Sequence, residues 1–148
     1  MVGWGGAYPL ELGRVVEPDD QPQISRVLTF KLGADGALPD LEWEAPEMPE
    51  PPEESFDAAL VSKGRDVYHN FCQYCHGDNA IGGGLVPDLR YSAVLHDAEM
   101  WDEVTLDGIF AEAGMAAFKD YIDGDQSQAV RAYVIDEAQK TKGATAAD

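Results

Sequence analysis

The sequence has few basic residues and no long apolar run. Ten lysines and arginines stand against 28 aspartates and glutamates in 148 residues, which gives a formal net charge of -18. A chain with this much negative charge repels phosphate groups. The charge therefore argues against nucleic acid and anionic lipid as partners. No stretch approaches the roughly 20 apolar residues that span a bilayer, so the sequence predicts no membrane insertion.

The first ten residues lack the features of a secretory leader. They contain neither a basic segment nor the apolar run that a signal peptide carries. With 45% hydrophobic and 26% charged residues, the composition is that of a folded chain, and the length suits one domain or a smaller one with an appendage. We expect a cytoplasmic protein, or a mature or excised part of a longer one.

Residues 1–38 contain two strand-like runs. In the second, residues 24–32, apolar residues recur with a period close to two, and the run stops at the turn signal Gly-Ala-Asp-Gly of residues 33–36. Two strands alone are only marginally stable in water. We therefore expect a short β-hairpin that docks on a sheet outside this chain.

Residues 39–55 form an acidic segment with five prolines and no basic residue. Such a composition favours an extended polyproline II chain, and 17 residues at ~3.1 Å each reach on the order of 50 Å. The pattern predicts a linker that tethers residues 1–38 to the rest. An acidic disordered tail is the alternative.

Residues 56–148 have a helical period, which predicts a mainly α domain. We expect three helices. The first begins at a cap of Ser55 or Asp57 and ends at Phe71. The second begins at Asp97 and ends at Gly108, and the third begins at Asp125 and ends at Gly143.

The chemistry of the sequence lies in a pentapeptide directly after the first expected helix. Cys72 and Cys75, the only two cysteines, lie three residues apart, and His76 follows at once. Two thiols at this spacing can add to the two vinyl groups of one haem, while the adjacent imidazole reaches its iron. The motif predicts one covalently attached haem c, with His76 as an iron ligand.

Two other uses of paired cysteines compete with haem. A structural zinc site requires about four ligands, and the sequence has no second pair of Cys or His residues. A thioredoxin-like dithiol favours a βαβ context and does not require the histidine. Either use would make the chain a metal-binding or thiol module.

A six-coordinate haem requires a second axial ligand, for which Met115 is the main candidate. This methionine lies among small residues between the second and third expected helices, where its thioether can approach iron without steric competition. A core gap-filler is the alternative role for Met115. Of the other candidates, Met100 is expected in the core, His96 beside a helix cap and His69 on the surface.

The sequence resembles a known family at these motifs. Residues 56–142 look like a monohaem class I cytochrome c domain. The segments that most resemble the C-terminal cytochrome domain of quinohaemoprotein alcohol dehydrogenases are Cys72–Gly77, Gly82–Gly84, Pro87–Arg90 and Gly114–Met115. In that family, a propeller that carries pyrroloquinoline quinone (PQQ) precedes the cytochrome, and residues 1–38 look like the end of such a propeller.

The resemblance also implies roles for particular residues. The carbonyl of Pro87 would accept a hydrogen bond from the ring nitrogen of His76 that does not bind iron. Arg90 would meet a haem propionate, and a surface cation is its alternative role. Gly64 and Tyr68 resemble the pair on the first helix that meets the last helix in class I cytochromes.

The implied function is electron transfer. The haem would accept electrons from the reduced PQQ of an alcohol dehydrogenase, an oxidoreductase, and pass them to an external acceptor; this chain alone would catalyse nothing. Haem attachment of this type implies a periplasmic location. The acidic surface would steer a basic partner, or serve solubility. The alternative is a freestanding cytochrome c, or a cytochrome subunit of another periplasmic oxidoreductase.

Overall fold

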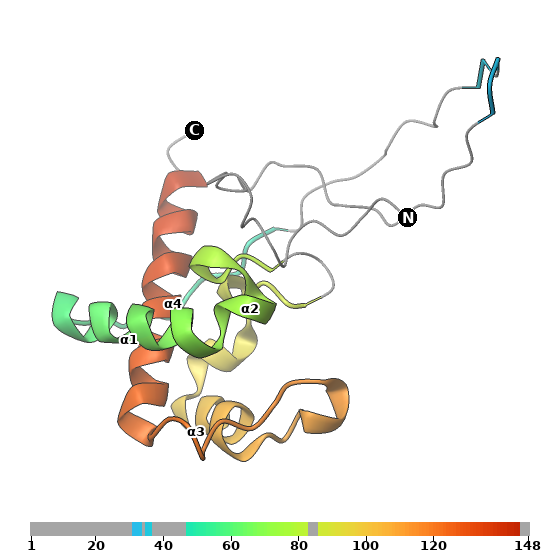
Figure 1. Ribbon diagram of the computed structural model, residues 1–148. Helices are drawn as coiled ribbons and strands as arrows, with labels where there is room; N and C mark the ends of the chain where they lie inside the picture. The colour runs from blue at the N-terminus through green and yellow to red at the C-terminus, as the bar shows by residue number, and fades with distance from the viewer. Residues whose placement is uncertain (1–30, 34, 37–46, 83–85, 146–148) are drawn as a thin grey trace.

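The structure, a computed structural model, describes residues 31–33, 35–36, 47–82 and 86–145. These residues form helices and short helical turns, without a strand among them, which confirms the prediction of a mainly α fold (Figure 1). The predicted hairpin lies outside the described residues, except for its expected end, where a turn occupies Leu32 and Gly33. None of the helices in the described ranges combines the length and the apolar character needed to cross a membrane.

Helix α1 (Ala58–Phe71) begins at one of the two predicted caps. The carboxylate of Asp57 accepts a hydrogen bond from the Leu60 amide at 2.8 Å, which satisfies an otherwise unpaired amide of the first turn. The helix ends where it was predicted to end, and the short helix α2 (Gln73–His76) follows Cys72 directly.

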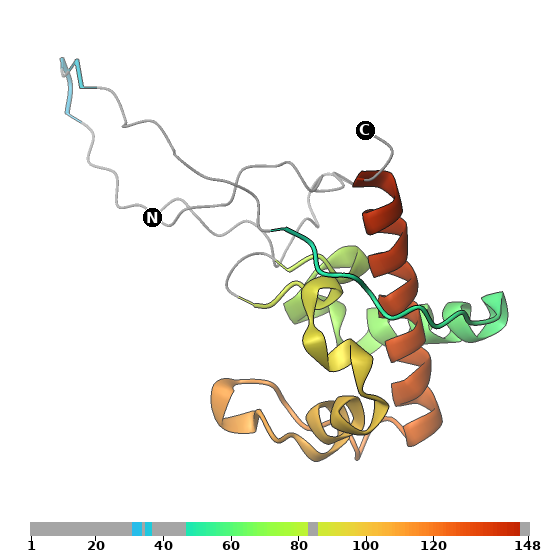
Figure 2. The same ribbon diagram turned by 180° about the vertical axis from the view of Figure 1, so that it is seen from behind.

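Helix α4 (Gly124–Thr145) is the longest helix and crosses α1, as both views show (Figures 1 and 2). The prediction that Asp125 caps this helix is wrong. Asp123 accepts from the amide of Gln126 at 2.8 Å, and the Gln126 side chain accepts from the amide of Asp123 at 3.0 Å. This reciprocal pair satisfies two amides, so the helix begins there.

The predicted end of α4 at Gly143 is also wrong, because the helix continues to Thr145. Lys142 holds the last turn by donating to the Met48 carbonyl at 2.8 Å and by pairing with Glu50 at 2.9 Å. These contacts keep the residues around Gly143 helical.

The crossing of α1 and α4 is the centre of the core. Gly64 lies directly against the backbone of α4, where a Cβ atom on it would stand 1.8 Å from the Ala129 carbonyl oxygen. One turn later, the rings of Tyr68 and Tyr133 pack with their centroids 5.2 Å apart, and both side chains are buried. The predicted pairing of Gly64 and Tyr68 with the last helix is thus present.

Short elements connect α2 to α4. In chain order they are η2 (Asp78–Ala80), η3 (Leu89–Tyr91), η4 (Ala93–His96), α3 (Ala98–Asp102), the π-helical turn η5 (Glu103–Asp107) and η6 (Ala111–Ala113).

The second predicted helix corresponds to α3 and η5. Its cap is Asp97, which accepts from the amides of Glu99 and Met100 at 3.0 Å each, and Gly108 ends η5 with a φ of 71°. The expectation that Met100 lies in the core is wrong, because its side chain is 37% exposed. The next residue, Trp101, is the one that α3 buries, with its indole donating to the Ser127 carbonyl of α4 at 3.0 Å.

Residues 47–55, which we call the strap, are the part of the predicted linker that the structure describes, and they pack against the domain. Gln139 donates to the carbonyls of Pro52 and Glu54 at 2.6 and 2.8 Å, and Met48 is buried. Prolines offer carbonyls without amides, so this segment takes its partners from side chains of α4. The remaining residues of the predicted linker, 39–46, lie outside the described part of the chain.

Replacing Glu54 with glutamine is expected to cost about 1 kcal/mol of stability at neutral pH, because the Glu54 side chain is partly exposed and Arg131 keeps its bond to the Leu95 carbonyl. The buried Arg131 side chain forms an ion pair with Glu54, whose other oxygen accepts from Nη1 at 3.0 Å. This contact lowers the pKa of Glu54 from its ordinary value of 4.5. The pair's contribution is therefore complete above about pH 4.5 and lost as the pH falls through the lowered pKa.

Urea unfolding of the wild type and Glu54→Gln between pH 3 and pH 7 measures this contribution. The matched control is Asp136→Asn, which removes one carboxylate partner of the exposed Lys140 while Glu137 remains. We expect a change of less than about 0.5 kcal/mol for the control. A stability difference between wild type and Glu54→Gln that does not narrow as the pH falls contradicts the assignment.

Candidate haem-binding site

The turn from α1 into α2 brings the two cysteines and the histidine onto one short helical segment. The amide of His76 donates to the Cys72 carbonyl at 3.0 Å, and the amide of Cys75 donates to the same oxygen at 3.2 Å. Cys72 is half-buried, Cys75 is exposed and His76 is buried. The three side chains are therefore available within about one turn, as attachment to a single macrocycle requires.

The His76 ring is oriented by one hydrogen bond. Its Nδ1 lies 3.0 Å from the carbonyl oxygen of Pro87, the contact that the resemblance implied. A carbonyl only accepts, so Nδ1 carries a proton, and in the neutral ring Nε2 then keeps its lone pair. Burial lowers the pKa of His76, opposed by this hydrogen bond and by the charge of Asp88. A neutral imidazole with a free Nε2 is the form that binds iron.

Gly82 makes the position of Pro87 possible. A Cβ atom on Gly82 would lie 2.3 Å from the amide nitrogen of Asp88 and 2.5 Å from the carbonyl carbon of Pro87. Only glycine allows the two backbone segments to approach this closely. Sequence reasoning noted Gly82 as part of a resemblance, but did not find this role.

Arg90 is buried, so its alternative role as an ordinary surface cation is wrong. Its Nε and Nη2 donate to the two carboxylate oxygens of Asp88 at 3.0 and 2.6 Å, and its Nη1 donates to Thr141 at 3.0 Å on α4. The segment that presents Pro87 is thereby attached to α4. A guanidinium has five N–H donors, so two remain beyond these three bonds.

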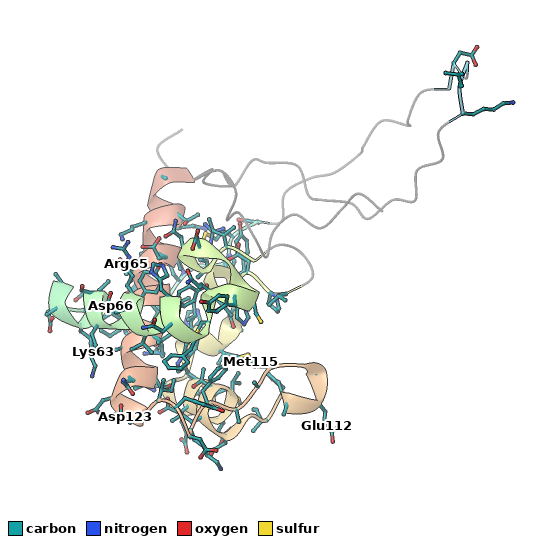
Figure 3. All side chains as sticks on the ribbon, viewed as in Figure 1. Lys63, Arg65, Asp66, Glu112, Met115 and Asp123 are labelled. Carbon is teal, nitrogen blue, oxygen red and sulfur yellow. The ribbon has the colours of Figure 1, made fainter. Side chains whose placement is uncertain are left out.

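Met115 lies on a different element from His76, in the loop between η6 and α4. Its amide donates to the Phe110 carbonyl at 3.1 Å, and the preceding Gly114 has a φ of 100°. The side chain is half-buried. Figure 3 shows Met115 on the part of this loop nearer α2, while Glu112 points outward.

The other candidate ligands have contacts of their own. Nε2 of His96 donates to the Glu50 carbonyl of the strap at 3.1 Å. The ring of His69 packs near Tyr68 and Tyr133, with centroid distances of 5.9 and 6.2 Å. Neither histidine is on the α2 segment or on the Met115 loop.

Large apolar side chains are exposed on the same two parts of the chain. Tyr74 on α2 is 56% exposed, and Ile109 and Phe110 before η6 are 48% and 47% exposed. A porphyrin is a large apolar ring that requires apolar surroundings. These side chains and the His, Met and Cys donors therefore fit a haem. Sequence reasoning missed Ile109 and Phe110, whose only signal was their place beside Gly108.

The competing uses of the cysteines find less support. Burial and the neighbouring Cys75 raise the pKa of the Cys72 thiol to about 12, which opposes formation of the reactive thiolate. The described residues contain no group of three or more His, Cys, Asp or Glu side chains arranged to hold a metal ion. The ligand set of a structural zinc site is therefore not assembled in this part of the chain.

A motif for haem attachment directly after the first helix, in a domain whose first and last helices cross, defines a cytochrome c domain. The model of the family described as "Cytochrome C oxidase, cbb3-type, subunit III" matches residues 59–134, and the chain belongs to this family. It is thus an electron-transfer cytochrome domain.

More particularly, the chain is similar to quinone-dependent alcohol dehydrogenases. It is 33% identical over 141 residues to the dehydrogenase subunit of the quinone alcohol dehydrogenase of Acetobacter aceti, covering 95% of this chain and 19% of that protein. Against quinohaemoprotein alcohol dehydrogenase ADH IIB of Pseudomonas putida it is 34% identical over 139 residues, covering 91% and 20%.

A solved structure agrees with these similarities. The structure of quinohaemoprotein alcohol dehydrogenase ADHIIG from Pseudomonas putida HK5 matches with a TM-score of 0.61 and 30% identity, covering 76% of this chain and 16% of that one. The chain therefore spans about a fifth of the length of the curated relatives described above.

Proposed function

We propose that this domain carries one haem c, bonded through thioethers to Cys72 and Cys75 and ligated at iron by His76 and Met115. The observation that carries the proposal is the His76 ring, which is buried and has Nδ1 3.0 Å from the Pro87 carbonyl oxygen, so that Nε2 is available to iron. When bound, the haem supplies reversible one-electron chemistry at iron. Arg90 directs its remaining donors to a propionate of that haem.

The chain's own residues set the conditions for that chemistry. His76 stays neutral because its pKa is lowered by burial, and Pro87 fixes its orientation. A thioether from Met115 is a weak donor that favours reduced iron and so raises the reduction potential. Because His76 and Met115 would both bind the iron, the site would transfer electrons and would offer no open position to a substrate.

We further propose that the electron donor is the reduced PQQ of an alcohol dehydrogenase of which this chain is the C-terminal part. The similarity to relatives named as quinone alcohol dehydrogenases extends over 95% of the chain, well beyond the cytochrome domain. On this proposal, residues 1–38 are the end of the PQQ-bearing propeller, with its final β-hairpin, and the acidic linker follows. The protein is periplasmic, and an external acceptor, attracted as a basic partner by the acidic surface, takes the electrons.

Haem attachment is tested by expressing the chain in a host with a cytochrome maturation system and extracting it with acidic acetone. We expect the wild-type chain to keep its haem, because a thioether bond survives conditions that release a merely ligated haem. Cys72→Ala combined with Cys75→Ala should lose essentially all colour. The matched control is Gln73→Ala, between the two cysteines, which should keep the haem. Loss of haem from the wild type on extraction contradicts covalent attachment.

A further inference from the structure

The π-helical turn η5 contains a buried hydroxyl that bonds across the turn. The Thr105 hydroxyl oxygen lies 2.8 Å from both the Trp101 carbonyl oxygen and the Ser127 hydroxyl oxygen on α4, and it shares its one proton between these two acceptors. Ser127, itself completely buried, donates to the carboxylate of Asp102 at 2.6 Å. Ser127 of α4 thereby contacts both Asp102, before the turn, and Thr105 within it.

This hydroxyl bonds back along the helix, from η5 to the last turn of α3. Its acceptor, the Trp101 carbonyl, lies four residues earlier and is the one that the amide of residue 105 would use in an α-helix. Back-bonding of this kind bends helices, and single π turns of this kind often occur at functional sites. The turn ends at Gly108, whose left-handed φ of 71° starts the following loop.

The same turn anchors the loop that carries Met115. The Phe118 amide donates to the Thr105 carbonyl at 2.8 Å. A Cβ atom on Gly108 would lie 2.7 Å from the Cβ of Ala117, so the two ends of the loop are in contact. Within the loop, the amide of Met115 donates to the Phe110 carbonyl at 3.1 Å. The position of Met115 therefore depends on where Thr105 directs its carbonyl.

We propose that Thr105 is a positioning residue for Met115: its hydroxyl, held between Trp101 and Ser127, fixes the π turn so that the loop from Gly108 to Phe118 presents the methionine at one place. This rests on the proposed role of Met115 as an iron ligand. Loss of the hydroxyl leaves the sequence of the loop unchanged but frees its anchor, so Met115 is displaced more easily from iron.

The experiment measures how tightly added imidazole binds the oxidised iron of the haem-loaded chain, because imidazole competes with Met115 for one axial position. Thr105→Val removes the hydroxyl with little change of shape, and we expect it to raise the imidazole affinity by about five- to tenfold. Thr105→Ser retains the hydroxyl and should remain within about twofold of the wild type. Ser127→Ala removes one partner of Thr105 and should raise the affinity by about threefold, which keeps the test open if Thr105→Val does not fold.

Val134→Ala, a change in the buried core of α4, is the control for a loss of stability that does not involve Met115. This variant should lower the melting temperature without changing the imidazole affinity. If Thr105→Val and Ser127→Ala bind imidazole no more tightly than Val134→Ala, the proposal is wrong.

The role of Met115 itself is tested separately. Met115→Ala should bind imidazole most tightly, and adding Thr105→Val to it should change nothing further. An affinity unchanged in Met115→Ala would overturn the ligand assignment under the proposed function. If Met115→Ala binds imidazole more tightly than the wild type and Thr105→Val does not, only the inference about Thr105 is overturned.

Discussion

Replacing Gly64 with alanine should destabilise the domain by about 3 kcal/mol or more, the largest effect we expect from a single added methyl group. The new Cβ would lie 1.8 Å from the Ala129 carbonyl oxygen and 2.5 Å from its carbonyl carbon. Both atoms belong to the backbone of α4, which cannot rotate away as a side chain would. The two helices must separate, and the packing of Tyr68 on Tyr133 is lost with their contact.

Gly143→Ala is the matched control, because it makes the same change in a helix where the added Cβ meets open space. Alanine exceeds glycine in helix propensity, so this variant should gain about 0.5–1 kcal/mol. Thermal unfolding of the haem-loaded proteins, followed by circular dichroism, compares the two. If Gly64→Ala unfolds at the same temperature as Gly143→Ala, the close crossing does not determine the stability of the domain.

Replacing Met115 with histidine should lower the reduction potential of the haem by on the order of a few tenths of a volt. The imidazole is a stronger donor than a thioether and stabilises the oxidised iron. The potential is measured by redox titration followed in the visible spectrum.

Met100→His is the control for this prediction, since Met100 is the other methionine considered as a ligand and its side chain is 37% exposed on α3. It should leave the potential and the spectrum close to those of the wild type. A potential that responds to Met100→His and not to Met115→His would exchange the roles of the two residues.

The features that could be predicted from sequence are those set by neighbouring residues. The caps Asp57 and Asp97 bond to amides two or three residues away, and the end of the second helix at Gly108 follows from a single backbone conformation. The spacing of Cys72, Cys75 and His76 is likewise local.

The features that were missed depend on partners far along the chain. Nothing near Arg90 in sequence indicates that its guanidinium will donate to Thr141. The strap is likewise held by Gln139 of α4, which lies 85 and 87 residues after its two partners. Asp123 was passed over as a cap because Asp125 has the same local signal. The reciprocal bond with Gln126 distinguishes the two, and it becomes visible only with side-chain geometry.

The strap has a consequence for how far the domain can travel. If residues 1–38 belong to a preceding propeller, the chain that connects the propeller to the cytochrome domain has eight residues, 39–46. It does not have 17, because the strap is bound to α4. Eight residues extend to less than about 30 Å. On the proposed function, the cytochrome would then stay close to its electron donor, and an acceptor would have to diffuse to the haem.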